Sequence, residues 1–566
     1  MKLNALIGVG ATLATTLVGP ALASAQHSES IGTKKVKHVL LLSVDGMHAV
    51  DYYNCSVGVA SVNNGEPYCP NLAALGSHGV NYVGTSTSKP SDSFPGLMTL
   101  MTGATPKTMG IYYDVAYDRT LAPPAQTTGN GLAAGPCVPY GVPTGTTTEY
   151  EEGIDIDQTK LNGGAPGASL TDGGIDSIDK NRLVRNPANG CAPVYPWDFT
   201  RVNTIFGVIK SAGGYTAWAD KHPAYSSVGG PGRNLDDYYA PEINSTVVAL
   251  PGVTTSEGYS CATIRDASDT SSWTNSFLNI QCNDQLKVNA ILKEIAGKTH
   301  TGAKAEVPTI FGMDYQAVSI GQKLIEKGVG TGGYTDAAGT PTPLLESEIE
   351  YVDATIGDMV HGLKDAGIYD ETVIIVTAKH GQSPIDPALY KPNGTFTPAT
   401  LIEADLPFSE SPANANGIGA TEDDISLLWL KDSSTTESDV ATLEKNSAEI
   451  GLGQIYYGST LALNYNTPGV GPGKDPRTPD IIVTPNVGVT YSNSKSKHSE
   501  HGGFAHDDTN VVLLVSHPDL KPETVSIPTA TAQVAPTILE VLGLSPSKLD
   551  AVKLEGTTQL PHLNLK

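Results

Sequence analysis

The sequence has few basic side chains and, beyond its N-terminal stretch, no apolar run long enough to span a membrane. Lysine and arginine total 35 against 59 aspartates and glutamates in 566 residues, which gives a formal net charge of −24. A surface this acidic repels nucleic-acid backbones and anionic membranes, so neither is expected as a docking partner. An anionic small substrate remains compatible with this charge, because a metal ion or a lysine can reverse the field within one cleft.

Charged residues make up only 17% of the chain, which contains 60 glycines and 39 prolines. This composition favours a loop-rich secreted enzyme over a helical bundle. The sequence shows no internal repeat, heptad run or low-complexity tail. Its length suits one large α/β domain with insertions, or two domains.

The N-terminus reads MKLNALIGVGATLATTLVGPALASAQHSES. One lysine is followed by a short apolar stretch and by small residues at Ala21, Ala23 and Ala25. This pattern predicts a secretory signal peptide over residues 1–25 and therefore a secreted protein. The alternative is a membrane anchor, but the apolar stretch is short and is interrupted by threonine and glycine.

Six cysteines lie outside this segment, and none forms a Cys-x-x-Cys pair. An even number in an exported chain favours disulfides over a metal site. Pairing between sequence neighbours would join Cys55 to Cys69, Cys137 to Cys191, and Cys261 to Cys282, although many other connectivities are possible. Sequons at Asn54, Asn244 and Asn393 predict a glycoprotein if the host glycosylates.

Strand patterns and helix patterns alternate along most of the chain, which predicts an α/β fold with helices on both faces of a sheet. Expected strands lie near residues 36–46, 214–225, 307–314, 373–377, 425–432, 480–485 and 510–518. Expected helices lie near residues 70–79, 201–213, 284–297, 342–367, 437–450 and 533–544. Residues 115–200 are rich in glycine, proline and threonine and are expected to form a cap insertion.

Polar side chains follow several of the expected strands. Asp45 follows LLLSV, Asp314 follows IFGM, and Lys379 and His380 follow VIIVTA. Ligand sites in open α/β sheets lie at this carboxyl edge, so these side chains are candidates for one site. Carboxylate and imidazole ligands together suit zinc or manganese.

Two further candidates come from loops, His501 in HSEHGGFAHDD and Ser93 just before an expected helix. A serine at a helix N-terminus is well placed to attack phosphorus, because backbone N–H groups there hold phosphoryl oxygens. Each candidate also has a structural alternative. Ser93 could be a helix cap, Asp45 a turn former, Lys379 a salt-bridge partner, and His501 a solvated side chain.

The segment over residues 220–244 combines basic, acidic and aromatic residues after an expected strand. Lys221, His222, Arg233 and Asp237 are therefore candidates for substrate binding, with Lys221 or Arg233 contacting a phosphate. The alternative is a surface loop whose glycines and prolines set turns.

The order of these motifs resembles the alkaline phosphatase superfamily, in particular its type I phosphodiesterase/nucleotide pyrophosphatase family. The resemblance covers residues 36–545 and is carried by VLLLSVDGM, KPSDSFPGLMTLMTGATPKTMGIYYD, the strand-ending Asp314, VIIVTAKHG, EHGGF and APTILEVLGL. It implies a mostly parallel central sheet with a loop-rich cap in one catalytic domain. It also implies a hydrolase acting on a small phosphate ester, either a phosphodiesterase, a nucleotide pyrophosphatase or a phosphomonoesterase.

By this resemblance Ser93 is the nucleophile, which forms a phosphoseryl-type intermediate and also contacts the metal. Asp45, Asp314, His380 and His501 fall on the family's metal ligands, and zinc is the expected ion. Three positions depart from the family's pattern. Lys379 replaces an aspartate ligand, Val318 replaces a histidine ligand, and Gly96 replaces an asparagine that helps to hold a phosphate oxygen.

These departures favour one metal ion, with the ammonium of Lys379 supplying charge that a second ion would otherwise supply. Two other functions stay open. A sulfatase shares the superfamily's fold, but the Ser91-Asp-Ser-Phe-Pro stretch lacks the arginine of the sulfatase signature. A non-catalytic secreted binding protein on a degenerate phosphatase fold is compatible with the two lost ligands.

Overall fold

The centre of the protein is a sheet built from short apolar runs. This computed structural model describes residues 35–129, 131–150, 177–245, 249–265, 272–406, 421–492, 494–563 and 565, so the predicted signal peptide lies outside the described residues. Within these ranges the central sheet has eight strands in the order β21-β2-β20-β13-β1-β10-β8-β9. Their bounds are β1 His38–Val44, β2 Gly79–Tyr82, β8 Ala217–Ala219, β9 Asp237–Tyr239, β10 Ile310–Tyr315, β13 Thr372–Thr377, β20 Leu513–Ser516 and β21 Glu523–Val525.

The sheet is mostly parallel, as the sequence predicts. β1 pairs in parallel with β10 and β13, β8 pairs in parallel with β10 and β9, and only β20 runs against its neighbours among the described strands. Strands covered on both faces are apolar at almost every position, which explains the uninterrupted runs of β1 and β13. The carboxyl ends of β13, β1, β10 and β8 consequently meet at one edge of the sheet.

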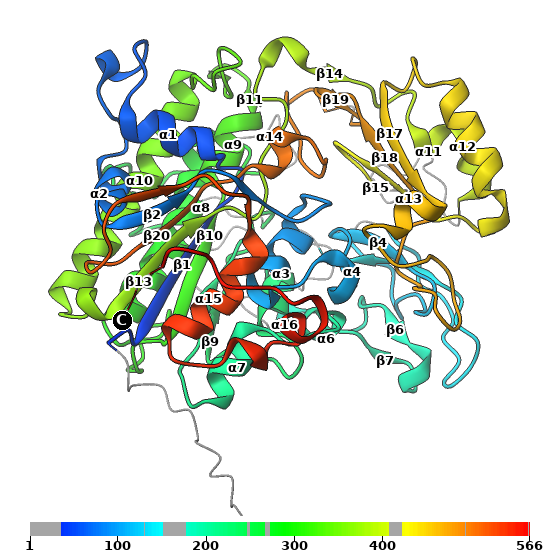
Figure 1. The fold of residues 1–566 in the computed structure, drawn as a ribbon, viewed down its shortest axis with the longest axis horizontal. Helices are drawn as coiled ribbons and strands as arrows, with labels where there is room; N and C mark the ends of the chain where they lie inside the picture. The colour runs from blue at the N-terminus through cyan, green and yellow to red at the C-terminus, as the bar shows by residue number, and fades with distance from the viewer. Residues whose placement is uncertain are drawn as a thin grey trace, which may run out of the picture.

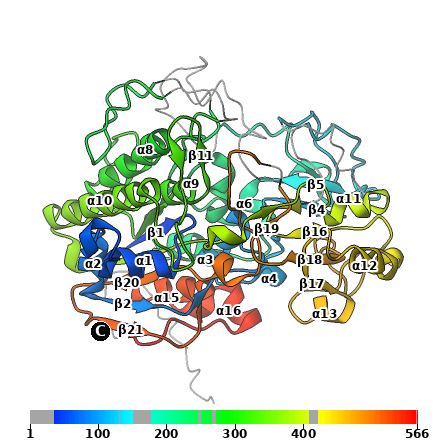
Figure 2. The same ribbon diagram turned by 90° about the horizontal axis from the view of Figure 1, so that it is seen from above.

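Helices cover both faces of the sheet (Figures 1 and 2). On one face lie α1 Ala49–Val57, α2 Pro70–Gly76, α8 Phe277–Ile295, α9 Ala317–Lys323 and α10 Pro343–Asp365. On the other face lie α3 Ser93–Thr102, α7 Ile205–Ser211, α15 Val534–Val541 and α16 Asp550–Glu555. Successive residues of β1 point to opposite faces of the sheet. Leu40 and Leu42 therefore pack in the core on the side of α8 and α10, and Val39 and Leu41 pack in the core on the side of α3 and α15.

A second sheet lies beside the main one, at the right of Figure 1. It is antiparallel, in the order β15-β16-β18-β17, with bounds β15 Thr421–Glu422, β16 Ser426–Leu428, β17 Leu452–Tyr457 and β18 Ile481–Pro485. The expected strands near 425–432 and 480–485 therefore pair with each other and do not join the alternating α/β sheet. Their side chains, with α12 Thr436–Lys445, build a separate apolar core, and strand patterns alone do not reveal which core a strand joins.

The expected cap insertion contributes no described strand to the central sheet. It forms the pairs β4 Val115–Asp118 with β5 Thr146–Glu149, and β6 Arg185–Asn186 with β7 Ala192–Pro193, followed by α6 Pro196–Phe199. It contacts the second sheet through the Thr421 hydroxyl of β15, which donates to the Val115 carbonyl of β4. Arg477, in the loop before β18, donates its Nε to Asp118 at 2.7 Å. The remaining strands and helices are β3 Thr85–Ser86, β11 Ile325–Glu326, β12 Gly330–Thr331, β14 Lys391–Pro392, β19 Val489–Thr490, β22 Thr529–Ala530, α4 Pro106–Met109, α11 Pro398–Leu401, α13 Gly458–Ala462 and α14 His506–Thr509.

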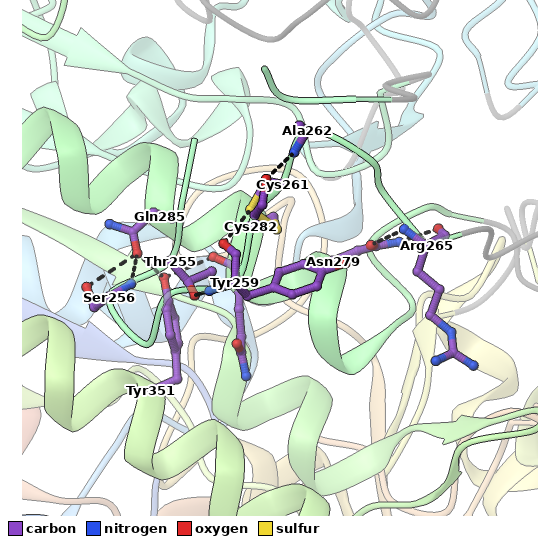
Figure 3. The surroundings of a disulfide bond; sticks show 12 residues. Thr255, Ser256, Tyr259, Cys261, Ala262, Arg265, Asn279, Cys282, Gln285 and Tyr351 are labelled. Carbon is purple, nitrogen blue, oxygen red and sulfur yellow. Dashed lines mark hydrogen bonds between the residues drawn. A yellow bond between two sulfur atoms is a disulfide. The ribbon is translucent and has the colours of Figure 1, made fainter. Parts of the chain in front are cut away.

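Three disulfides join the cysteines in the predicted pairs, 55 with 69, 137 with 191, and 261 with 282. The bond between Cys261 and Cys282 ties a loop to α8 (Figure 3). The same loop is held by hydrogen bonds from Ser256 N to Gln285 Oε1 and from Asn279 Nδ2 to the Arg265 carbonyl. This bond therefore anchors a segment with little secondary structure to one long helix.

Asn54, at the first sequon, is buried and donates its side-chain amide to the carbonyls of Ala338 and Gly339. Its amide nitrogen faces the protein interior, which disfavours glycosylation there, whereas Asn244 and Asn393 are not buried. In the described part of the chain, no helix combines the length and the apolar character that crossing a bilayer requires.

Candidate functional site

The strand-end candidates meet at the carboxyl edge of the central sheet. β1 lies between β10 and β13, with Ser43 opposite both Asp314 and Thr377. This register brings Asp45, Asp314 and Lys379 together although they are far apart in sequence. β8 ends at the same edge and adds Lys221 to the group.

Ser93 is the first residue of α3 and is 1% exposed. Asp92 caps this helix by accepting a hydrogen bond from Phe94 N at 3.2 Å, which fixes where α3 begins. The Ser93 hydroxyl lies 3.2 Å from His380 Nε2 and accepts a hydrogen bond from Lys221 Nζ at 3.4 Å. The predicted nucleophile therefore lies between an imidazole and an ammonium.

His380 is held from two sides. Its Nδ1 donates to the Gly381 carbonyl at 2.8 Å, and its Nε2 lies 2.6 Å from Asp45 Oδ1. The His501 ring is 4.0 Å from the His380 ring between centroids, and His501 Nδ1 is 3.7 Å from Asp92 Oδ1. His501 therefore belongs to the group around Ser93.

Lys379 is completely buried and contacts two carboxylates. Its Nζ lies 2.8 Å from Asp314 Oδ2 and 3.2 Å from Asp45 Oδ2. Gln316 makes the same bridge, since its Nε2 donates to Asp45 Oδ2 at 2.5 Å and to Asp314 Oδ2 at 2.6 Å. Two nitrogen groups thus occupy the space between the two carboxylates.

The charges in the site shift several pKa values. Burial raises the pKa of Asp45, but the charges of His380 and Lys379 outweigh burial and hold this pKa well below its usual range. Burial lowers the pKa of Lys379, but Asp314 and Asp45 outweigh that effect, so the pKa is raised and the side chain stays an ammonium. Burial and the charge of His380 hold the pKa of His501 well below its usual range, which leaves the His501 imidazole neutral.

Of the four residues predicted to bind substrate, Lys221 contacts the group around Ser93. His222 is buried with its ring 4.1 Å from that of Tyr225, between centroids. Arg233 is exposed and lies over the Trp197 ring. Asp237 begins β9, so it lies at the opposite edge of the parallel sheet, where it contacts His300 at 2.5 Å.

The sequence analysis missed Gln316 in the site and did not single out Lys323, whose charge acts on His501. Gln316 lies two positions after Asp314, and that closeness to a strand end was the available signal. Lys323 lies at the end of α9. Burial and the charge of Lys497 lower its pKa to about 8, and the charges of Asp45 and Lys221 also affect this pKa. Nothing in its sequence context distinguishes Lys323 from a surface lysine.

A pocket of about 470 Å³ lies beyond the loop that precedes Ser93, between α3 and the second sheet. Its lining includes Lys89, Thr99, Tyr456, Tyr465 and Phe504, and it does not include Ser93. The lining likewise does not include Asp45, Asp314, Lys379, His380 or His501.

Asp424 and Asp508 form a buried pair of carboxyl groups next to the His501 loop. Asp424 N donates to the His501 carbonyl at 3.2 Å, and Asp508 Oδ2 accepts from Ala505 N at the same distance. Burial raises the pKa of Asp508 to about 7, and burial and the charge of Asp508 raise the pKa of Asp424 well above its usual range.

This pair predicts a stability that falls as pH rises. Above about pH 4 the unfolded chain has released the Asp508 proton, whereas the folded protein keeps it up to about pH 7. The free energy of unfolding should fall by about 1.4 kcal/mol per pH unit over this interval because of Asp508. Asp508→Asn should reduce the fall in unfolding free energy per pH unit, measured by urea denaturation at several pH values. Asp365→Asn, at an exposed position, should leave this pH dependence unchanged. The same pH dependence in wild type and Asp508→Asn would contradict this assignment.

The sheet, its flanking helices and the carboxyl-edge cluster of acidic, imidazole and hydroxyl groups define an alkaline-phosphatase-like α/β fold. The chain belongs to the type I phosphodiesterase/nucleotide pyrophosphatase family, whose model matches residues 39–143 and 329–508. Ser93, Asp45, His380 and His501 lie within the matched segments, whereas Lys221 and Asp314 lie between them. A comparison with curated protein sequences finds no significant match.

Solved structures of a murine protein share the fold. Murine ectonucleotide pyrophosphatase/phosphodiesterase 5, as an inactive variant in complex with AMP, aligns with a TM-score of 0.53 at 14% identity over 90% of this chain and 96% of that chain. The same murine protein in a second structure aligns with a TM-score of 0.52 and the same identity and coverage. At this identity the likeness establishes the fold alone.

Members of this family typically depend on a divalent metal ion. Asp45 Oδ1, His380 Nε2 and Ser93 Oγ converge, and this mixed donor set suits zinc or manganese. Among the described residues, no three His, Cys, Asp or Glu side chains form a metal-binding group, so the Ser93 hydroxyl is needed to complete the set. The space between Asp45 Oδ2 and Asp314 Oδ2 does not fit an ion, because N–H donors face both oxygens.

Proposed function

We propose that this protein is a secreted hydrolase of phosphoric esters or anhydrides, with Ser93 as the nucleophile. The observation that carries this proposal is the Ser93 hydroxyl at the N-terminus of α3, 3.2 Å from His380 Nε2 and 3.4 Å from Lys221 Nζ. Family membership supports phosphodiester and nucleotide pyrophosphate bonds as the substrate class. Secretion is supported by the three disulfides, which persist in oxidising compartments.

In the first step Ser93 Oγ gives its proton to solvent water and forms a bond to phosphorus, while the bond from phosphorus to the leaving oxygen breaks and that oxygen departs with the electron pair. The ammonium of Lys221 is close enough to favour the deprotonated Ser93 oxygen by its charge. The first turn of α3 directs the positive end of its dipole toward the phosphoryl oxygens. Water then attacks phosphorus, releases the product and restores the Ser93 hydroxyl.

Asp45, His380 and Ser93 would hold one divalent ion, and when bound this ion supplies positive charge to the phosphoryl oxygens. His380 is oriented for this role by its Nδ1 hydrogen bond to the Gly381 carbonyl, which turns Nε2 toward Asp45 and Ser93. Neutral His501 packs against the His380 ring, with 4.0 Å between the ring centroids.

The proposal is tested by turnover of p-nitrophenyl phosphate and bis(p-nitrophenyl) phosphate, followed by acid quenching and mass spectrometry of the Ser93 peptide. We expect faster turnover of the diester and a substrate-derived phosphoryl group on Ser93. No turnover with zinc or manganese would favour a non-catalytic binding protein. An adduct on another residue would contradict Ser93 as the nucleophile.

A further inference from the structure

The place between Asp45 and Asp314 is filled by the protein itself. Both carboxylates are at most 1% exposed and turn their Oδ2 atoms toward the same small space. Two buried carboxylates this close repel each other unless a cation lies between them. The residues that reach this space are Lys379 and Gln316.

Four contacts of 2.5–3.2 Å join the two Oδ2 atoms to Lys379 Nζ and Gln316 Nε2. An ammonium has three N–H donors and no lone pair, and the amide nitrogen likewise acts only as a donor. Neither group can ligate a metal through these atoms. Both would have to leave before an ion could bind the two Oδ2 oxygens together.

The backbone around Lys379 is also fixed. Gly96 in α3 packs directly on it, since a Cβ atom placed on Gly96 would lie 2.1 Å from the Lys379 carbonyl oxygen. That carbonyl also accepts a hydrogen bond from the Thr87 hydroxyl. Any side chain at position 96, asparagine included, would therefore clash with the main chain of Lys379, so Gly96 allows α3 to pack closely on that backbone.

Charge balance disfavours a second dication at this point. Lys221 Nζ is 3.9 Å from Asp45 Oδ2, so the carboxylate pair already has two ammonium groups within 4 Å. Adding a divalent ion beside two buried ammonium groups would bring like charges together in a poorly solvated space. Asp45 Oδ1 faces His380 Nε2 at 2.6 Å, and this imidazole nitrogen can bind a metal ion once it gives up its proton, which the ammonium of Lys379 cannot do.

We propose that Lys379 and Gln316 replace a metal ion between Asp45 and Asp314, so that the centre binds one divalent ion and not two. Lys379 supplies the charge, and Gln316 is a positioning residue that holds the two carboxylates at the ammonium. The inference rests on the proposed function only in taking Asp45, His380 and Ser93 as the ligands of the single ion.

The test is the metal content of the full-length protein after zinc saturation and gel filtration, measured by plasma mass spectrometry. We expect one equivalent in the wild type. Lys379→Asp combined with Gln316→Ala exchanges the ammonium for a carboxylate and removes the bridging amide, and this double variant should raise the content to two equivalents. Lys379→Met combined with Gln316→Ala removes both donors without adding a ligand, so this matched control should stay at one equivalent.

Anomalous diffraction at the zinc edge provides a measurement that needs no variant. We expect one peak near Asp45 Oδ1 and His380 Nε2, with the Lys379 side chain between the carboxylates. Zero or two equivalents in the wild type, or a peak between Asp45 and Asp314, would overturn the inference. Turnover is measured separately. If the protein binds one ion but does not hydrolyse phosphate esters, this inference stands and the proposed function is wrong.

Discussion

Ser93→Ala is expected to lower kcat/KM for bis(p-nitrophenyl) phosphate by about 10³-fold or more, because it removes the attacking oxygen. The same change removes one donor from the proposed metal set, so zinc affinity should fall as well. Steady-state kinetics at saturating zinc separates the two effects, since added metal restores binding but not the nucleophile. Circular dichroism checks that the variant is folded.

Ser91→Ala is the matched control for Ser93→Ala. Ser91 is also buried, lies in the same loop, and donates its hydroxyl to the Gly503 carbonyl at 2.9 Å. Its loss should cost about 1 kcal/mol of stability and leave kcat/KM within a few-fold of the wild type. Equal losses of activity in both variants would mean that the hydroxyls only support the loop, and Ser93 would lose its role as nucleophile.

Lys379→Met is expected to lower the free energy of unfolding by about 3–5 kcal/mol, because it leaves the buried carboxylates of Asp45 and Asp314 without their ammonium partner. It should also lower kcat/KM by about 100-fold, since the two carboxylates then repel each other beside the nucleophile. Urea denaturation and steady-state kinetics measure the two effects.

Lys37→Met is the control for the loss of stability. Lys37 Nζ also lies 2.7 Å from a carboxylate, that of Glu371, but Lys37 is exposed and Glu371 is partly exposed. Water screens this pair, so its loss should cost less than about 1 kcal/mol. Equal costs for the two lysines would show that Lys379 is not a buried charge partner of Asp45 and Asp314.

The strands that carry the site could be predicted from local pattern. The apolar runs before Asp45, Asp314 and Lys379 are long enough to identify buried strands, and polar residues end them. Strands are present near 425–432 and 480–485 as predicted, but they belong to the second sheet and not to the central one. The apolar pattern of a strand does not indicate which sheet the strand joins. The predicted role of Asp237 has no support from its position, because it starts its strand and parallel strands place their two ends at opposite edges.

Sequence alone determined the residue types at the strand ends, the hydroxyl at the start of α3 and the family, because these depend on neighbouring positions and on motif order. Only the tertiary structure decided which ammonium meets Ser93. Lys221 reaches it from 128 residues away, whereas Lys379 turns to the carboxylates and is joined there by Gln316. These partners depend on strand order, since β8 lies beside β10 and β10 beside β1, and strand order follows from the packing of the whole sheet.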